Sequence, residues 1–468
     1  MKGAGRFASG LTQGDAVKQI TGVAPSGSMG SGYNLESFKR AMAAQPDFIG
    51  QDAGTTDTGP YYHGDDRPFL PLSAYRRDLE VMLDAARAAK IPLLIGSALT
   101  NGSNQTLALM EQMVREVAKE KKHSFRLAII NAEIDKTYLK AKVANGKVEA
   151  MGPDSDLTAQ MIDSAGPIVA QMGIEPFMHA LEGGAEVIVA GRACDDAIFA
   201  ALPVLRGFDP GLALHCGKIL ECAGLSAVPY DLGEPMIGRV RKDHFEVEPG
   251  SASNRCTTVS VASHSLYERS DPFLQAGPGG INDLTHSKFE QVDPRRVQVS
   301  GSRFIKDNQY RVKLEGAERI GYRSIVIVGI RDAVMIRELD GVIAHARERA
   351  EQRFGTKKDG INLMFRTYGK DGVMGALEPD KGFVPKEVGL VIDAVAPTQD
   401  LATAIAMFTR GVMQHADYPG ILTTAGNMAY PFSPFGIPVG PAYRFNVYHL
   451  MPVDNPLECF PVRFEEIR

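Results

Sequence analysis

The sequence contains no tryptophan, and phenylalanine and tyrosine make up only 7% of its 468 residues. It also lacks an excess of positive charge, because 51 lysines and arginines stand against 56 aspartates and glutamates, for a net charge of -5. Nucleic acids and anionic membranes are bound by basic faces, and single strands also by aromatic rings that stack on the bases. The composition therefore argues against both as the main partner.

Cysteine is scarce, and no long hydrophobic run is present. The five cysteines are Cys194, Cys216, Cys222, Cys256 and Cys459, an odd and scattered set unlike the dense framework of a small secreted module. No segment reaches the roughly 18 apolar residues of a membrane span, and residues 1–22 lack the apolar core of a signal peptide. We therefore expect a cytoplasmic protein that does not use a membrane.

Several catalytic motifs are also absent: G-x-S-x-G, H-E-x-x-H and the P-loop. This lowers the expectation of a serine hydrolase, a zinc protease or a nucleotide kinase. Glycine and proline, in contrast, number 48 and 28 and exceed their usual share. We therefore look for function in loops.

The order of apolar patterns predicts an α/β fold in three parts. Residues 1–228 alternate short apolar runs with helical patterns, which is typical of a parallel sheet flanked by helices. Residues 229–320 form a β-rich insertion, and residues 321–468 follow the β-α-β-β-α-β order of a ferredoxin-like α+β domain. The strands expected in the first part are residues 19–23, 47–51, 92–97, 126–132 and 186–190. Helices are expected at residues 72–90 and 107–122, and further strands of the insertion at 255–261 and 296–301.

Polar or glycine-rich sequence follows nearly every strand expected in the first part, at the position where an open parallel sheet binds its ligands. After the first strand, backbone N–H groups of Gly27, Gly30 and Gly32 could hold a carboxylate or phosphate, although a plain tight turn explains them as well. After the second come the candidate catalytic residues Asp52, Asp57 and His63, with Thr55 and Thr56 as candidate substrate contacts. The alternative for the two aspartates is capping and turn formation.

The fourth and fifth strands add further candidates. Asn131 and Glu133 follow the fourth, and Glu133 is either paired with Lys136 or Arg192 or poised for proton transfer. Arg192 follows the fifth and could anchor a substrate carboxylate, while Asp195 either orients it or caps the next helix.

A second group lies on one face of a predicted helix, where His215, Lys218 and Cys222 are spaced at i, i+3 and i+7. We interpret Lys218 as a reserve acid or base and His215 as a substrate contact, whereas the cysteines fit small core residues. Their spacing does not support zinc. An oxygen-rich set of Asp52, Asp57 and Glu133 would instead suit magnesium or manganese, so a divalent cation is an open option.

Five longer motifs resemble one bacterial family. They are residues 46–62 (PDFIGQDAGTTDTGPYY), 131–136 (NAEIDK), 173–177 (GIEPF), 189–197 (VAGRACDDA) and 217–222 (GKILEC). Together they are similar to the acyclic terpene utilisation (AtuA-type) family, and the resemblance runs from about residue 20 to 332 and again at 426–432. It implies a catabolic enzyme, a lyase or hydratase acting on branched carboxylic acids or their CoA thioesters, and it supplies no catalytic residues to transfer.

Three functions remain open. The leading hypothesis is a hydro-lyase or carbon–carbon lyase that acts on a small anionic substrate, either a free acid or an acyl-CoA. The alternatives are a hydrolase of an amide, lactone or thioester, and a metabolite-binding subunit of an enzyme complex. Catabolic enzymes of this size are often symmetric, so we expect a homo-oligomer, with a small partner subunit as a further option.

Overall fold

A computed structural model describes residues 17–151 and 156–468 of the chain. The chain divides into two units, one made of the residues up to 317 together with 445–468, and the other of residues 318–444. The predicted boundaries differ from this division, because the segment from 229 to 317 belongs to the first unit and the chain returns to that unit at its end. The unit boundaries fall inside two long strands, β15 (Arg311–Ile330) and β18 (Ile437–Pro452).

Ten of the described strands form the central sheet of the first unit, in the order β12-β13-β9-β8-β1-β2-β3-β7-β4-β19. Five consecutive strands of this sheet, from β1 to β4 in that order, are parallel, as predicted. They are β1 (Ile20–Ala24), β2 (Phe48–Asp52), β3 (Leu93–Gly96), β4 (Phe125–Ile130) and β7 (Val187–Ala190). The flanking strands pair antiparallel. They are β8 (Met236–Val240), β9 (His244–Pro249), β12 (Lys288–Gln291), β13 (Val297–Ser300) and β19 (Val462–Ile467).

Helices cover both faces of this sheet because its strands are apolar on both sides. Ile49 and Ile95 pack with α1 (Leu35–Ala43), α3 (Leu72–Ala89) and α4 (Asn104–Lys121). Phe48 and Leu94, one residue away along each strand, point to the opposite face and pack with α7, α8 and α9. The bounds of these helices are α7 (Ile174–Glu182), α8 (Asp195–Leu205) and α9 (Pro210–Leu220).

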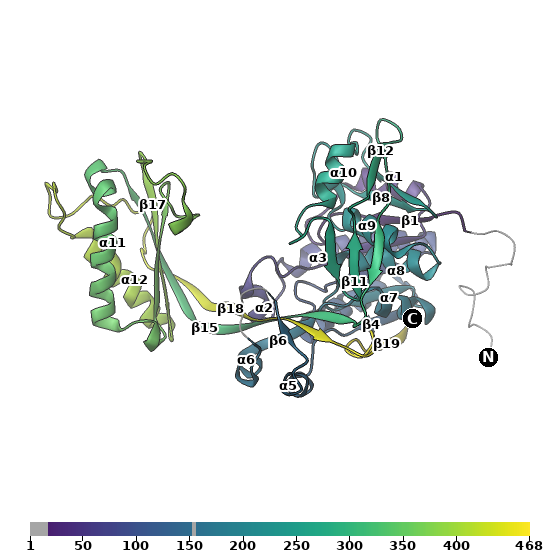
Figure 1. Cartoon of the computed structure of the whole chain (residues 1–468), viewed down its shortest axis with the longest axis horizontal. Helices are drawn as coiled ribbons and strands as arrows, with labels where there is room; N and C mark the ends of the chain where they lie inside the picture. The colour runs from purple at the N-terminus through teal and green to yellow at the C-terminus, as the bar shows by residue number, and fades with distance from the viewer. Residues whose placement is uncertain (1–16, 152–155) are drawn as a thin grey trace. The chain divides into compact units, whose positions relative to one another are not determined.

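The β-rich segment is not a separate domain. Four of its strands extend the central sheet, and three more form a small antiparallel sheet: β10 (Leu274–Gly277), β11 (Gly280–Asp283) and β14 (Arg303–Lys306). β11 and β14 of this small sheet contact α9 (Figure 1). The expected strand at residues 255–261 is wrong, because α10 (Thr258–Ser265) begins there. Thr257 and Ser260 each accept a hydrogen bond from the other's backbone N–H, and this capping box starts a helix.

The second unit has the predicted ferredoxin-like order. β16 (Asn362–Tyr368) and β15 both pair antiparallel with β17 (Val388–Ala396), and β18 is the next strand beyond β15. The two crossover helices, α11 (Ala333–Phe354) and α12 (Gln399–Gln414), bury Leu339 and Ile405 in one core with the sheet.

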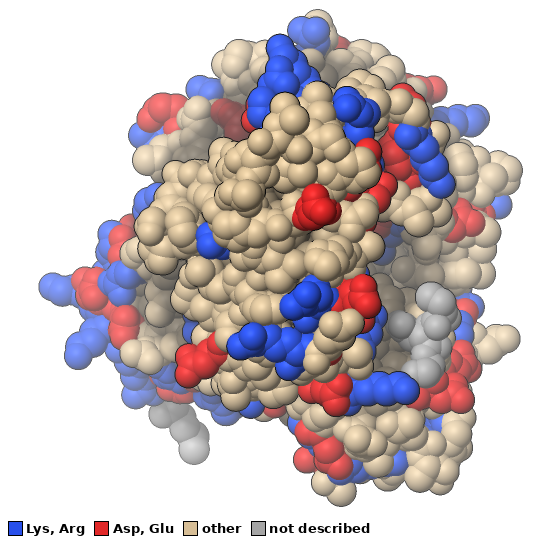
Figure 2. Space-filling model, turned by 90° about the vertical axis from the view of Figure 1, so that its left-hand side faces the viewer, with Lys and Arg blue, Asp and Glu red and all other residues tan. Residues whose placement is uncertain are grey.

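The remaining elements are short. They are α2 (Pro60–Gly64), α5 (Lys136–Ala144), β5 (Glu149–Ala150), α6 (Ala159–Ser164) and β6 (Ala165–Ala170), with 3-10 turns at Ala223–Ser226, Lys357–Asp359 and Gly375–Leu377. Among the helices in the described ranges, none has the length and apolar character needed to cross a bilayer. On the face drawn in Figure 2, lysine, arginine, aspartate and glutamate are interspersed around a broad uncharged area.

Candidate active site at the carboxyl ends of the parallel strands

Three neighbouring parallel strands end at the same edge of the central sheet and bring their polar residues together. Asp52 ends β2, Ser97 follows β3, and Arg192 follows β7. The loops after β2 and β3 touch at Gly54, where a Cβ atom would lie 2.2 Å from the Ser97 carbonyl oxygen and 2.3 Å from that of Thr100. Only glycine permits this approach, which holds Asp52 beside the end of β3.

Arg192 lies at the centre of the site and is 4% exposed. Its Nε donates to Glu315 Oε2 at 2.8 Å, and its Nη1 reaches Ser97 Oγ at 3.2 Å and Asp195 Oδ1 at 3.4 Å. Nη2 takes part in none of these three contacts. The guanidinium is therefore fixed by the protein through two of its nitrogens.

Glu315 is the buried counter-charge of Arg192, and it comes from β15. Its other oxygen accepts from Thr56 Oγ1 at 2.9 Å and lies 2.7 Å from Lys313 Nζ. Burial alone would raise the pKa of Glu315, but Arg192 and Lys313 outweigh burial and hold that pKa well below its usual value. Glu315 is therefore an ionised group that positions Arg192, not an acid or a base.

Asp52 and Asp195 are carboxylates of a different kind. Burial raises the pKa of Asp52 well above its usual value, and the neighbouring Asp195 raises it further. Burial also raises the pKa of Asp195, although Arg192 acts in the opposite direction. Two neighbouring carboxyl groups with raised pKa values are suited to hold and pass protons.

Helix α9 brings a second charged pair to this edge. Its Gly217 packs directly on the start of α8, where a Cβ atom would lie 2.4 Å from the Asp196 carbonyl oxygen. The next residue, Lys218, has its Nζ 2.6 Å from Glu221 Oε1 and 3.7 Å from Glu268 Oε2, and all but 2% of its side chain is buried. Burial, and after it Asp195, raises the pKa of Glu221. We refer to Asp52, Arg192, Asp195, Lys218, Glu221 and Glu315 as the charged cluster.

Other residues predicted for the site lie at the edge of the charged cluster or make contacts within the fold. The Asp57 carboxyl meets that of Glu268, and its backbone N–H donates to Thr55 Oγ1 at 3.0 Å. His63 is 1% exposed, and its Nε2 lies 3.1 Å from the Pro167 carbonyl oxygen. Burial lowers the pKa of His63, against the effect of Glu315. His63 is thus a neutral imidazole next to the cluster.

The glycine-rich loop after β1 already binds the side-chain carboxylate of Asp78. Gly30 and Gly32 donate to Asp78 Oδ2 at 2.7 and 3.1 Å, and Gly27 donates to the Leu232 carbonyl oxygen at 3.0 Å. The structure therefore gives these N–H groups partners within the chain. The backbone N–H groups of Gly27, Gly30 and Gly32 are therefore already used, and none of these three is left to bind a substrate anion as predicted.

Glu133 and Asn131 form a separate group at the end of β4. Glu133 accepts from the backbone N–H of Asn104 at 2.8 Å, and the Asn131 amide donates to Asn104 Oδ1 at 2.7 Å. Burial raises the pKa of Glu133, and Asp66 contributes. Asp52, Asp57 and Glu133 each have different neighbours, and within residues 17–151 and 156–468 no three His, Cys, Asp or Glu side chains are arranged to hold a metal ion. The predicted cation set does not fit this arrangement.

His215 is enclosed in the core on α9. Its Nδ1 lies 2.7 Å from Ser302 Oγ and its Nε2 lies 2.8 Å from Ser265 Oγ, so both ring nitrogens have partners. The side chain is fully buried, and burial lowers the pKa of His215 to about 3. This geometry leaves no nitrogen for a substrate.

We therefore expect His215 to remain neutral across the physiological range. Because its folded-state pKa lies below the unfolded value, the unfolded state binds the proton first, and stability is lost as the pH falls below about 6.5. The check is the imidazole Hε1 resonance in an NMR titration, assigned by its absence in His215→Gln. A midpoint near 6.5 for that resonance would contradict the buried arrangement.

Sequence reasoning missed Glu315, Glu268 and Lys313. Glu315 and Lys313 alternate with buried Val312 and Leu314 along β15, a pattern typical of a strand with one solvated face. Glu268 follows α10, in the segment that the sequence predicts to be β-rich. Nothing local marks Glu315 or Glu268, because their partners Arg192 and Lys218 are more than 40 positions away in the sequence. Lys313 joins the site only through its pair with Glu315.

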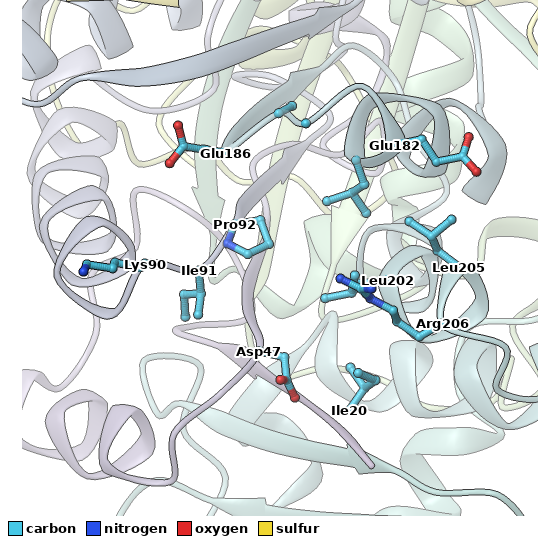
Figure 3. Close-up of a pocket in the computed structure, with 13 residues that line it drawn as sticks. Ile20, Asp47, Lys90, Ile91, Pro92, Glu182, Glu186, Leu202, Leu205 and Arg206 are labelled. Atoms are coloured by element: carbon cyan, nitrogen blue, oxygen red, sulfur yellow. The ribbon is translucent and has the colours of Figure 1, made fainter. Parts of the chain in front are cut away.

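A hollow of about 490 Å³ lies at the opposite edge of the sheet, where β1, β2, β3 and β7 begin (Figure 3). Asp47 and Arg206 line this hollow together with Ile20, Pro92 and Leu202. The Asp47 carboxylate already accepts from the Thr21 N–H at 2.7 Å. Since ligands of open α/β sheets bind at the carboxyl ends of the strands, this hollow is not the candidate site.

Comparison with protein families gives one description for this chain. Comparisons with curated proteins and with solved structures give no match. The model of the acyclic terpene utilisation family protein AtuA matches residues 72–430, which include Arg192, Asp195, Lys218, Glu221 and Glu315 of the charged cluster. The family name points to a catabolic role, and the match covers more than half of the sequence. The chain therefore belongs to the AtuA family of acyclic terpene utilisation proteins.

Proposed function

We propose that the chain is a lyase that adds or removes water next to the carboxyl or thioester group of a branched acid. The observation that carries this proposal is the pair Asp52 and Asp195, two carboxyl groups with raised pKa values beside a fixed Arg192. Elimination of water needs a base for a carbon-bound proton, an acid for the leaving hydroxyl, and positive charge near the developing enolate.

The surroundings of the two aspartates indicate which of them is the base and which is the acid. Asp195 lies 3.4 Å from Arg192, whose charge lowers the pKa of Asp195 against the effect of burial, and its side chain is 33% exposed, so we assign it as the base. Asp52 is 8% exposed and its pKa is raised more strongly, which favours the protonated form, so we assign it as the acid.

The step balances without a further reactant. Asp195 takes the proton from the carbon next to the carboxyl or thioester group, and the electron pair of that C–H bond forms the double bond. Asp52 gives its proton to the hydroxyl on the next carbon as that C–O bond breaks, and water leaves. The Arg192 guanidinium and the Lys218 ammonium group supply positive charge for the enolate oxygen. Hydration is the same step in reverse.

The test is product analysis with purified protein on methyl-branched 3-hydroxy acids and on their CoA thioesters. We expect conversion of the hydroxy compound to the unsaturated one, with loss of water and no release of CoA. Release of free CoA or of a cleaved acid would identify a hydrolase instead. The absence of turnover on both substrate series at millimolar concentration would contradict the lyase assignment.

A further inference from the structure

Lys218 is covered by two residues that are themselves exposed to solvent. Only 2% of the Lys218 side chain is exposed. The Tyr267 ring lies over its Nζ at 5.4 Å, and Glu268 Oε2 lies 3.7 Å from the same nitrogen. Tyr267 is 52% exposed and the Glu268 side chain 42%. These two residues, which we call the covering pair, therefore separate Lys218 from solvent, and a ligand that reaches Lys218 from this side must displace them.

The covering pair belongs to a short segment with few backbone contacts. α10 ends at Ser265, and the chain is fixed again at Asp271, whose carboxylate accepts from the Leu274 N–H at 2.9 Å. Between these points, the N–H groups of Glu268 and Arg269 make no backbone hydrogen bond within the described part of the chain. Exposed segments without such bonds open at a low free-energy cost. The segment is therefore held mainly by its side chains.

The position of Glu268 at Lys218 is opposed by its other surroundings. Its carboxyl also meets that of Asp57, and two carboxyl groups in contact repel each other unless they share a proton. The Glu268 backbone has a φ of 63°, in the left-handed region that residues other than glycine rarely adopt. Arg269, in contrast, anchors the segment, because its Nη2 lies 3.3 Å from Asp196 Oδ2. We therefore expect the covering pair to move while Arg269 stays in place.

The contacts of Lys218 indicate which ligand group fits in place of Glu268. An ammonium group has three donors, and a charge-assisted hydrogen bond to a carboxylate is about 2.7–2.9 Å long. Glu221, at 2.6 Å and 5% exposed, makes such a bond, whereas Glu268 at 3.7 Å does not. A ligand carboxylate can therefore approach Lys218 more closely than Glu268 does, without displacing Glu221. A neutral group would leave this part of the Lys218 charge without a counter-ion.

We propose that Glu268 is a built-in competitor of the substrate: the covering pair moves away, and a free carboxylate of the substrate takes the place of Glu268 at Lys218. The proposal rests on the proposed function, since it names the substrate class of the same site, an acid with a free carboxylate. It also explains how a ligand reaches a lysine that the chain itself covers.

The first experiment measures binding by calorimetry with 3-methylhexanoic acid and 3-methylhexanamide, which share one hydrocarbon body and differ in negative charge. Neither has a hydroxyl group to lose, so binding is observed without turnover. Glu268→Gln keeps the size of the side chain and removes its charge. It should bind the acid about tenfold more tightly than the wild type does, because the competing contact is lost. Glu268→Ala should give the same gain, and the affinity for the amide should stay the same.

Asp271→Asn is the matched control for these variants. It removes the same charge three positions further along the chain, from a carboxylate that caps its own turn. The affinity of Asp271→Asn for the acid should equal that of the wild type. The midpoint of thermal unfolding verifies that each variant is folded.

The second experiment follows the covering pair itself. The sequence has no tryptophan, so Tyr267→Trp introduces a single indole, which keeps the aromatic contact with the Lys218 ammonium group. Saturation with the acid should shift the indole emission to longer wavelength and increase its quenching by acrylamide, because the ring leaves Lys218 and enters water. Tyr368→Trp, at an exposed position of the second unit, should show neither change.

Four results would overturn the proposal. They are Glu268→Gln binding the acid no more tightly than the wild type, an equal gain from Asp271→Asn, an unchanged indole signal in Tyr267→Trp saturated with the acid, and no binding of the acid to wild type or Glu268→Gln at millimolar concentration. Failure of the proposed function gives a different result: product analysis then shows no loss of water, while the acid still binds and still changes the indole signal.

Discussion

Replacing Asp52 with asparagine is expected to lower turnover about 10²- to 10⁴-fold, the usual contribution of a general acid. Asparagine keeps the size and the hydrogen-bonding shape of the side chain but has no proton to give to the leaving hydroxyl. Steady-state kinetics on the substrate found by product analysis measure the loss. Since the change removes a group used in the transition state, kcat should fall far more than KM rises.

Although Asp52→Asn should lose turnover, its folded state should become more stable. Because the folded-state pKa of Asp52 is raised, its contribution to stability is full below the unfolded value and is lost as the pH rises through the folded value. Asparagine carries no such dependence. The variant is therefore expected to gain stability over wild type as the pH rises above about 4, seen as a higher midpoint of thermal unfolding.

A matched control lies at the other edge of the sheet. Burial raises the pKa of Asp47 as well, but Asp47 borders the hollow of Figure 3 and bonds the Thr21 N–H. Asp47→Asn should leave kcat unchanged. The variant Asp195→Asn should lose turnover like Asp52→Asn, and the double variant should lose little more, since both act in one step. Full turnover in Asp52→Asn would contradict the assignment.

The parallel core was predictable because its signal is local. Each central strand is a short apolar run, and the structure places its bounds within two residues of those expected, as for β2 (Phe48–Asp52). The amphipathic stripe of α3 is local too, and its Leu79, Met82 and Leu83 are buried as expected. The rule that parallel strands end at one edge then brings Asp52 and Arg192 together.

The rest depended on contacts between distant segments. Glu315 lies 123 positions from Arg192, and nothing in the pattern of β15 distinguishes it from a solvated side chain. Asp78, on α3, accepts hydrogen bonds from the N–H groups of Gly30 and Gly32, which lie more than 40 residues earlier in the sequence. The division into units also depends on distant contacts, because the chain returns to the first unit after residue 444 and pairs β19 with β4, which composition does not reveal.

Arg192→Met should destabilise the first unit by about 3–5 kcal/mol, the cost of removing one partner from a buried ion pair. The Glu315 carboxylate, which is 1% exposed, would keep only Lys313 and Thr56. Urea unfolding followed by circular dichroism measures the loss. The control is Arg463→Met, which breaks an exposed pair with Glu111 at 2.7 Å and should cost no more than about 1 kcal/mol.

The pH dependence of this stability loss distinguishes the effect of removing the Arg192 charge from the effect of removing its packing. In the wild type the folded-state pKa of Glu315 is lowered, so its stabilisation is present above the unfolded value near 4.5 and is lost as the pH falls. The difference between wild type and Arg192→Met should therefore shrink in acid. Adding Glu315→Met removes the buried carboxylate that has lost its partner Arg192, and should restore most of the stability at neutral pH. If the double variant is instead as unstable as Arg192→Met, Arg192 acts through packing, and the charge on Glu315 does not position it.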